Sequence, residues 1–150
     1  MPNLAEYPRL ADKLASLEAY LPTILKEGRP ELRRVGEAFM LTQGKRIRPV
    51  VAILSAEMTG YKGEQDVRLG AVVELVHLAT LVHDDILDEA RLRRGERSVN
   101  FTWGNELAVL FGDYLYTKAM DEAIKLGRLD MIAALCQTTV EMIQGELAQH

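Results

Sequence analysis

The chain has 150 residues, of which 48% are apolar and only 6% aromatic, so it is long enough for one domain with a hydrophobic core. Its 18 basic and 22 acidic residues give a net charge of −4, which argues against a nucleic-acid-binding protein. A single cysteine excludes an intrachain disulfide, and the lack of a signal sequence or long apolar run predicts a cytoplasmic protein without a transmembrane segment.

Apolar residues recur with helical spacing along almost the whole chain, and no segment predicts a convincing strand. The first amphipathic helix covers residues 10–24, and Pro22 is expected to kink it or end it early. A short helix is predicted over residues 30–44 and a third over residues 49–58. These elements favour an all-α protein.

A long central helix is predicted over residues 66–88, and its middle is apolar on nearly every side, which is typical of a buried core helix. A polar loop is expected over residues 91–100. Two further helices follow, over residues 105–126 and 130–150, and Cys136 in the last one is expected to be buried. Together the elements predict one all-α domain over residues 1–150.

Three aspartates, Asp84, Asp85 and Asp88, lie at the end of the central helix. Asp84 and Asp88 lie one turn apart on one face, whereas Asp85 is rotated from Asp84 by about 100°. Carboxylates at a helix C-terminus repel one another and oppose the helix dipole, and a divalent cation removes both conflicts. Mg²⁺ fits best because it binds carboxylate and phosphate oxygens together. A solvated acidic helix end is the alternative.

A second charged group, Lys45, Arg46 and Arg48, precedes the predicted helix start at Pro49. Cations are unfavourable at the positive end of a helix, whereas the backbone N–H groups there attract anions. A phosphate bound between the cations would resolve this conflict. A solvent-exposed basic turn is the alternative interpretation.

A third group contains four arginines around Gly95, namely Arg91, Arg93, Arg94 and Arg97. Arginine binds phosphate oxygens in a bidentate manner, so these side chains are candidates for a second phosphate contact. Charge balance with the neighbouring aspartates is the alternative, and both interpretations can hold together.

Glu74 and His77 have the Glu-x-x-His spacing found in di-iron helix bundles. Such bundles need two of these pairs and the sequence has one, so a metal-storage or di-iron protein is the weaker hypothesis. Gly112 and Gly145 fall inside predicted helices, where glycine costs about 1 kcal/mol relative to alanine. Close helix packing or a ligand cavity would each explain them.

Residues 74–95, which contain the Glu-x-x-His pair, the aspartates and two arginines, resemble the trans-isoprenyl diphosphate synthases. Residues 44–49 match a second signature of that family, and residues 103–105 and 112–113 are also similar to it. The resemblance covers nearly the whole chain. It implies an antiparallel helical bundle of the isoprenoid synthase type and a Mg²⁺-dependent condensation of isopentenyl diphosphate with an allylic diphosphate.

The resemblance also assigns roles to individual residues. Asp84 and Asp88 would be metal ligands, with Asp85 in a supporting catalytic role, and Mg²⁺ would join them to the allylic diphosphate. Arg93 would hold the allylic diphosphate. Isopentenyl diphosphate would be held by Lys45, Arg48, His77 and Arg94.

Two further residues are implied to set the product length. In this family, the residues four and five positions before the first aspartate form the floor of the elongation pocket, and here they are Thr80 and Ala79. Neither is a bulky aromatic residue, so we expect a product longer than farnesyl. An Ala79→Phe substitution is expected to shorten it.

Members of this family are longer than this chain and carry a second aspartate-rich motif in the C-terminal half, which this sequence lacks. We therefore expect an N-terminal portion that is inactive alone and that exposes an apolar patch where the other half would pack. A homodimer, or association with a second half, would cover such a patch. The alternative function is a non-catalytic helical partner that binds diphosphate or a sister chain.

Overall fold

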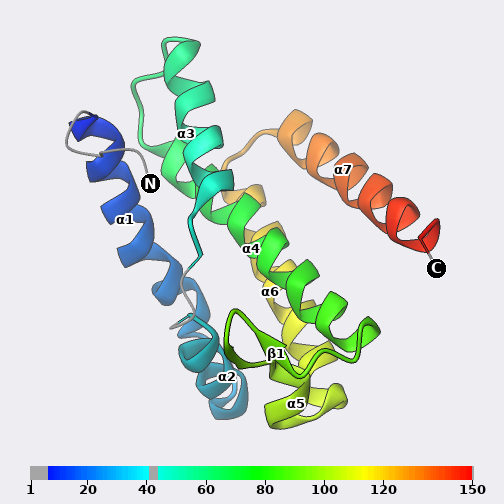
Figure 1. Cartoon of the computed structure of the whole chain (residues 1–150). Helices are drawn as coiled ribbons and strands as arrows, with labels where there is room; N and C mark the ends of the chain where they lie inside the picture. Colours follow the sequence, from blue (N-terminus) through cyan, green and yellow to red (C-terminus); the bar gives the residue numbers. More distant parts are fainter. Residues whose placement is uncertain (1–6, 41–43, 150) are drawn as a thin grey trace.

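The computed structural model describes residues 7–40 and 44–149, and these residues form an all-α bundle with one short hairpin (Figure 1). The helices are α1 (Pro8–Leu25), α2 (Pro30–Met40), α3 (Ile47–Met58), α4 (Gln65–Leu87), α5 (Val99–Trp103), α6 (Asn105–Lys125) and α7 (Leu129–Leu147). The hairpin strands are β1 (Leu92–Arg93) and β2 (Glu96–Arg97). None of the described helices is both long enough and apolar enough to cross a membrane.

Helix α4 lies at the centre of the bundle and packs along α6, with α3 and α1 against its other sides. Leu75 and Val82 of α4 are fully buried, as are Phe111 and Leu115 of α6. Burying each large apolar side chain contributes about 1.5–3 kcal/mol, so this contact supplies much of the stability. The prediction of a buried central helix is confirmed, and its rigid packing fixes the end that carries the aspartates.

The alternative that the first helix ends early at Pro22 is wrong, and so is the predicted start of the third helix. Helix α1 continues through Pro22 to Leu25, because Ile24 and Leu25 are buried and their packing outweighs the hydrogen bond that proline cannot form. Helix α3 begins at Ile47 and not at Pro49, because Arg46 occupies the N-cap in the left-handed region. The predicted extension of the second helix towards residue 44 lies on residues 41–43, outside the described residues.

The segment predicted as a plain loop contains the β1–β2 hairpin, with Arg93 opposite Glu96. The turn residues Arg94 and Gly95 both have positive φ, at 53° and 87°, which is typical of a two-residue type I′ turn. Strands of two residues leave no alternation in the sequence, so the pattern could not reveal them. The hairpin directs Arg93 and Arg94 to different sides of the segment.

Helix α7 lies at the edge of the bundle, across α4 and α6 from α1 (Figure 1), and none of its described residues is buried. The expectation that Cys136 is buried is therefore wrong, since this cysteine is exposed. The expected apolar patch is present, because α7 exposes Val140, Ile143 and Leu147. Helix α7 ends at Leu147, so the prediction that it continues to residue 150 is wrong, and His150 itself lies outside the described residues.

Candidate functional site

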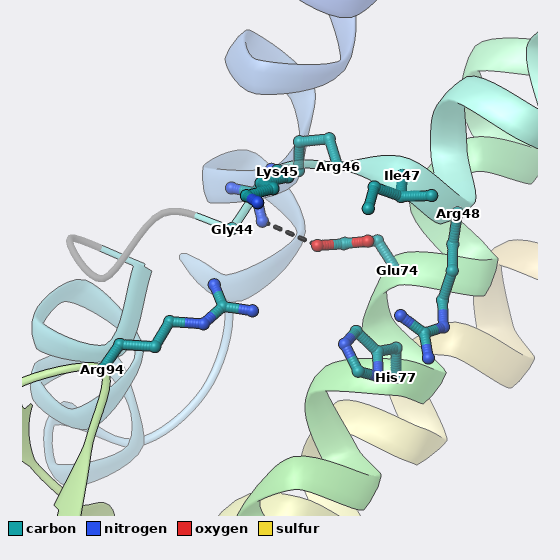
Figure 2. Close-up of a pocket in the computed structure, with 8 residues that line it drawn as sticks. All are labelled: Gly44, Lys45, Arg46, Ile47, Arg48, Glu74, His77 and Arg94. Atoms are coloured by element: carbon teal, nitrogen blue, oxygen red, sulfur yellow. Dashed lines mark hydrogen bonds and ion pairs between the residues drawn. The ribbon is translucent and has the colours of Figure 1, made fainter. Parts of the chain in front are cut away.

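A cavity of about 400 Å³ lies between the start of α3, the middle of α4 and the turn of the hairpin (Figure 2). Lys45 and Arg48 reach it from the start of α3, and His77 reaches it from α4. Arg94 enters from the hairpin on the opposite side, with its guanidinium directed towards the cavity. The structure thus brings together all four residues that the sequence assigned to isopentenyl diphosphate. Arg46 and Glu74 also line this cavity, so its wall carries four permanent cations and one carboxylate. This excess of positive charge favours a polyanionic ligand.

Residues 45–48 form a basic segment that contains Lys45, Arg46 and Arg48. Within it, the side chain of Arg46 is buried, at 7% exposure. Its Nε donates to Oε1 of Glu18 at 2.6 Å, and its Nη1 donates to Oε1 of Glu74 at 2.8 Å. Burial alone would lower the pKa of Arg46, but the hydrogen bonds to the two carboxylates outweigh burial and raise it. The idea that an external phosphate must separate all three cations is therefore wrong for Arg46, which has carboxylates of the chain as partners.

Glu74 is thus engaged with Arg46 and is not paired with a second Glu-x-x-His motif. Within residues 7–40 and 44–149, no group of three histidine, cysteine or carboxylate side chains is arranged to hold a metal ion by itself. These two observations disfavour the di-iron hypothesis for the described chain.

Burial lowers the pKa of His77 to about 4, and the positive charges of Arg48, Arg94 and Arg93 act in the same direction. The imidazole is therefore neutral near pH 7 and adds no charge of its own to the cavity. The Thr80 hydroxyl donates to the His77 carbonyl at 2.8 Å.

Gly44 allows the close approach of Arg94 to the start of α3. A Cβ at this position would lie 2.8 Å from Nη1 of Arg94, closer than real side chains tolerate. The guanidinium is flexible enough to move away, so a larger residue here would displace Arg94 from the cavity and leave the fold intact.

The middle aspartate, Asp85, is 1% exposed and is held by Arg93. The guanidinium donates from Nε to Oδ1 at 2.7 Å, and Nη2 lies 2.6 Å from the same oxygen. Asn100 also donates from Nδ2 to the Asp85 carbonyl at 3.0 Å. Arg93 does not line the cavity of Figure 2 and lies instead in a separate hollow beside α2 and α5. Arg93 and Arg94, which are adjacent in the sequence, therefore line different cavities.

The first aspartate, Asp84, lines a cavity of about 460 Å³ between the end of α4 and α7. Burial raises the pKa of its carboxyl, the charge of Glu146 raises it further, and Arg93 acts in the opposite direction. Asp88 caps α4 one turn later and is exposed. Two carboxylates from one helix end suit Mg²⁺, which commonly binds one or two carboxylates and completes its shell with phosphate and water.

Sequence reasoning missed Glu146, which faces Asp84 from α7. The glycine before it, Gly145, was the available signal, because it is a glycine in a helix interior and lines the same cavity. Thr80 also lines this cavity, as the assignment to product length requires. Ala79 does not, because it is 2% exposed and lies in the apolar core.

The chain is similar to known proteins both in sequence and in fold. The family model described as polyprenyl synthetase matches residues 29–150. The octaprenyl diphosphate synthase of Escherichia coli (strain K12) is 34% identical over 93% of this chain and 43% of its own length. Component 2 of the heptaprenyl diphosphate synthase of Geobacillus stearothermophilus is 35% identical over 97% of this chain and 45% of its own length.

Among solved structures, the chain is similar to a polyprenyl synthase from Caulobacter crescentus CB15 in complex with calcium and isoprenyl diphosphate. The TM-score is 0.88 at 28% identity, over 93% of this chain and 43% of that one. The chain therefore spans less than half the length of the curated relatives and of the structure that it matches.

Proposed function

Because the chain belongs to the polyprenyl synthetase family, we propose that it supplies the N-terminal half of a Mg²⁺-dependent trans-polyprenyl diphosphate synthase. Such an enzyme condenses isopentenyl diphosphate with an allylic diphosphate to make a polyprenyl diphosphate. The observation that carries the proposal is the meeting of four dispersed residues in one cavity: Lys45, Arg48, His77 and Arg94.

In this proposal the cavity of Figure 2 binds the diphosphate of isopentenyl diphosphate. Lys45, Arg48 and Arg94 neutralise its charge, and the arginines can contact two phosphate oxygens at once. His77 contributes a hydrogen bond without adding charge, because its imidazole is neutral. Water is displaced from a site whose cations are already in position, and this preorganisation favours tight binding.

The allylic diphosphate is assigned to the aspartate end of α4. Asp84 lies seven residues after His77, two turns along one face of α4. The helical rise therefore separates these two residues by about 10 Å along the helix axis. Asp84 and Asp88 would hold Mg²⁺, and Asp85 would keep Arg93 beside them. When bound, Mg²⁺ neutralises the charge that develops on the departing diphosphate. Arg93 retains donors that Asp85 does not use, and in this proposal they contact the allylic diphosphate.

The product is proposed to be longer than farnesyl. The cavity beside Asp84 has about 460 Å³, and Thr80 at its wall is small. No bulky side chain at this position closes the space below the aspartates. Two of the matched relatives are named octaprenyl diphosphate synthase and heptaprenyl diphosphate synthase component 2, and these names agree with this assignment.

A second function, that of a non-catalytic partner subunit, is favoured by one observation. One matched relative is named component 2 of its synthase, and this chain spans 45% of that relative. Association with a second half or a second copy would cover the exposed apolar side chains of α7, among them Ile143 and Leu147. A cytoplasmic location and a homodimer remain predictions.

The natural protein that contains this sequence should be assayed with labelled isopentenyl diphosphate, an allylic diphosphate and Mg²⁺. We expect elongation, and we expect it to stop when the metal is chelated. The Lys45→Ala variant should elongate less efficiently, through a higher KM for isopentenyl diphosphate. Elongation only after addition of a sister chain would favour the partner function. No elongation under either condition would refute the proposed enzyme.

A further inference from the structure

We propose that Arg46 is a positioning residue that sets the geometry of the isopentenyl diphosphate cavity by holding Glu18 and Glu74. The inference rests on the function proposed for that cavity, and it concerns the residues behind the ligand. The guanidinium of Arg46 is satisfied by the chain itself, through hydrogen bonds to Glu18 and Glu74. Its role is therefore separate from that of Lys45 and Arg48.

The conformation of Arg46 is unfavourable without its partners. Its φ of 49° and ψ of 34° lie in the left-handed region, which residues other than glycine rarely occupy. Its charge is also removed from water, because the side chain is 7% exposed. A buried guanidinium in such a backbone persists only where the surroundings determine it. Three hydrogen bonds to Glu18 and Glu74 meet that condition.

These bonds connect three helices at the edge of the cavity. Glu18 lies on α1 and Glu74 on α4, while Arg46 forms the start of α3. Lys45 and Arg48 stand on either side of Arg46 in the chain, so its placement fixes where both cations enter. His77 follows Glu74 by three residues on the same face of α4. The contact with Glu74 therefore sets the spacing between the cations and the imidazole.

Arg46 has a second effect, on the charge inside the cavity. Glu74 lines the cavity, and its carboxylate would repel a diphosphate. The Arg46 Nη1 hydrogen bond at 2.8 Å offsets this charge (Figure 2). A lysine at position 46 would keep the charge but could not reach both carboxylates with a planar fork. Charge alone is thus insufficient, and Arg46→Lys separates charge from geometry.

The chain offers a matched control in the buried ion pair of Lys13 and Asp66. Asp66 and Glu74 both lie on α4, both are 3% exposed, and each faces a buried cation from another segment. Asp66 does not line the cavity of Figure 2. Asp66→Asn and Glu74→Gln therefore remove the same charge from equally buried sites, one remote from the cavity and one at its wall.

The experiment compares wild-type natural protein with Glu74→Gln, Arg46→Lys and Asp66→Asn. We expect the first two variants to raise the KM for isopentenyl diphosphate about tenfold, with the KM for the allylic substrate and the saturated rate changed much less. In Glu74→Gln the repelling carboxylate is also removed, so a higher KM in this variant requires that the lost position of Arg46 outweighs that gain. Asp66→Asn should lower the thermal midpoint and leave both KM values unchanged. Glu18→Gln, a milder variant at the half-exposed carboxylate, should fold and should raise the same KM to a smaller extent.

The dissociation constant of inorganic pyrophosphate, measured by calorimetry in the presence of EDTA, reports on binding in the cavity without catalytic turnover. We expect the variants to raise this dissociation constant in the same order in which they raise the KM for isopentenyl diphosphate. Equal effects of Asp66→Asn and Glu74→Gln, parallel changes in both KM values, or wild-type affinity in Arg46→Lys would overturn the inference. Wild-type protein that does not elongate any allylic starter would refute the proposed enzyme instead, and the pyrophosphate series would still decide the role of Arg46.

Discussion

Gly112 of α6 lies against the imidazole of His83 on α4, so that a Cβ at this glycine would stand 2.6 Å from Cδ2 and 2.9 Å from Cε1 of the ring. The ring Nε2 faces the Val109 carbonyl at 3.3 Å and lies 3.5 Å from a carboxylate oxygen of Asp113. His83, the residue directly before Asp84, therefore packs against α6. Gly112 has no side chain, and this absence explains how closely α4 and α6 approach. Close packing accounts for this helix-interior glycine.

Gly112→Ala is expected to lower the free energy of unfolding by about 1–3 kcal/mol, because the methyl group overpacks the contact with His83. In a His83→Ala background the sign should reverse, since alanine then adds up to about 1 kcal/mol of helix propensity without a clash. Urea denaturation of the four proteins measures this cycle. Gly145→Ala is the control, because nothing lies within 4 Å of a Cβ there. An equal loss in both backgrounds would contradict the packing explanation.

The stability of the protein should depend on pH through His77. Its pKa is lowered to about 4 by burial and by Arg48, Arg94 and Arg93, so the unfolded chain binds a proton between about pH 6.5 and 4 that the folded chain does not. Stability from this group is complete above that window and is lost as the pH falls through it. His77→Gln should flatten the dependence, measured by urea denaturation at about pH 7 and about pH 5.

Pyrophosphate supplies a direct check on the origin of this pKa. Bound in the cavity, it should offset the three arginines and raise the pKa of His77 by about one unit or more. The NMR titration of the imidazole with and without pyrophosphate measures the change. An unchanged midpoint at saturating pyrophosphate would show that the ligand binds elsewhere.

Much of the fold was predictable because α4 has an unambiguous pattern. The expected range of 66–88 differs from Gln65–Leu87 by one residue at each end, since an apolar run and an acidic cluster mark its limits. Cys136 was placed wrongly because apolar spacing shows which face of a helix seeks burial and does not show whether another element covers it. The hairpin escaped because its strands are two residues long.

The candidate site was predictable in its residues and less so in its contacts. The four residues of the cavity of Figure 2 follow from two sequence motifs, and the fold brings them together. The inward orientation of Arg46 depends on Glu18 and Glu74, each 28 residues away, and no local pattern encodes such a contact. The pairing of Arg93 with Asp85 likewise needs the turn of the hairpin.

Loss of Arg93 should be costly because it leaves the Asp85 carboxylate, 1% exposed, without its counter-charge. We expect Arg93→Met to lower the free energy of unfolding by about 2–4 kcal/mol. This loss is smaller than for a fully buried ion pair, because Arg93 is partly exposed to water. The double variant Arg93→Met/Asp85→Leu should recover most of the loss. Denaturant unfolding measures both, and a double variant no more stable than the single one would argue that packing, and not the ion pair, is responsible.

Metal binding should depend on the two aspartates that Arg93 does not hold. With inorganic pyrophosphate present, Mg²⁺ at about a hundredfold excess over its Kd should stabilise the natural protein by about 2–3 kcal/mol. Asp84→Asn and Asp88→Asn should remove most of this gain. The exposed Asp12→Asn on α1 should retain it. A metal-dependent gain that persists in both α4 variants would place the ion elsewhere.

The wall of the cavity beside Asp84 provides a test of product length. Thr80→Phe should fill part of the space of about 460 Å³ and shorten the polyprenyl product, with Mg²⁺ dependence retained. Ala79→Phe, expected from the sequence to act in the same way, has to enter the apolar core, so it should also destabilise the fold by about 1–3 kcal/mol. Chromatography of the products separates the effects. An unchanged product from stably folded Thr80→Phe would mean that the growing chain does not pass this residue.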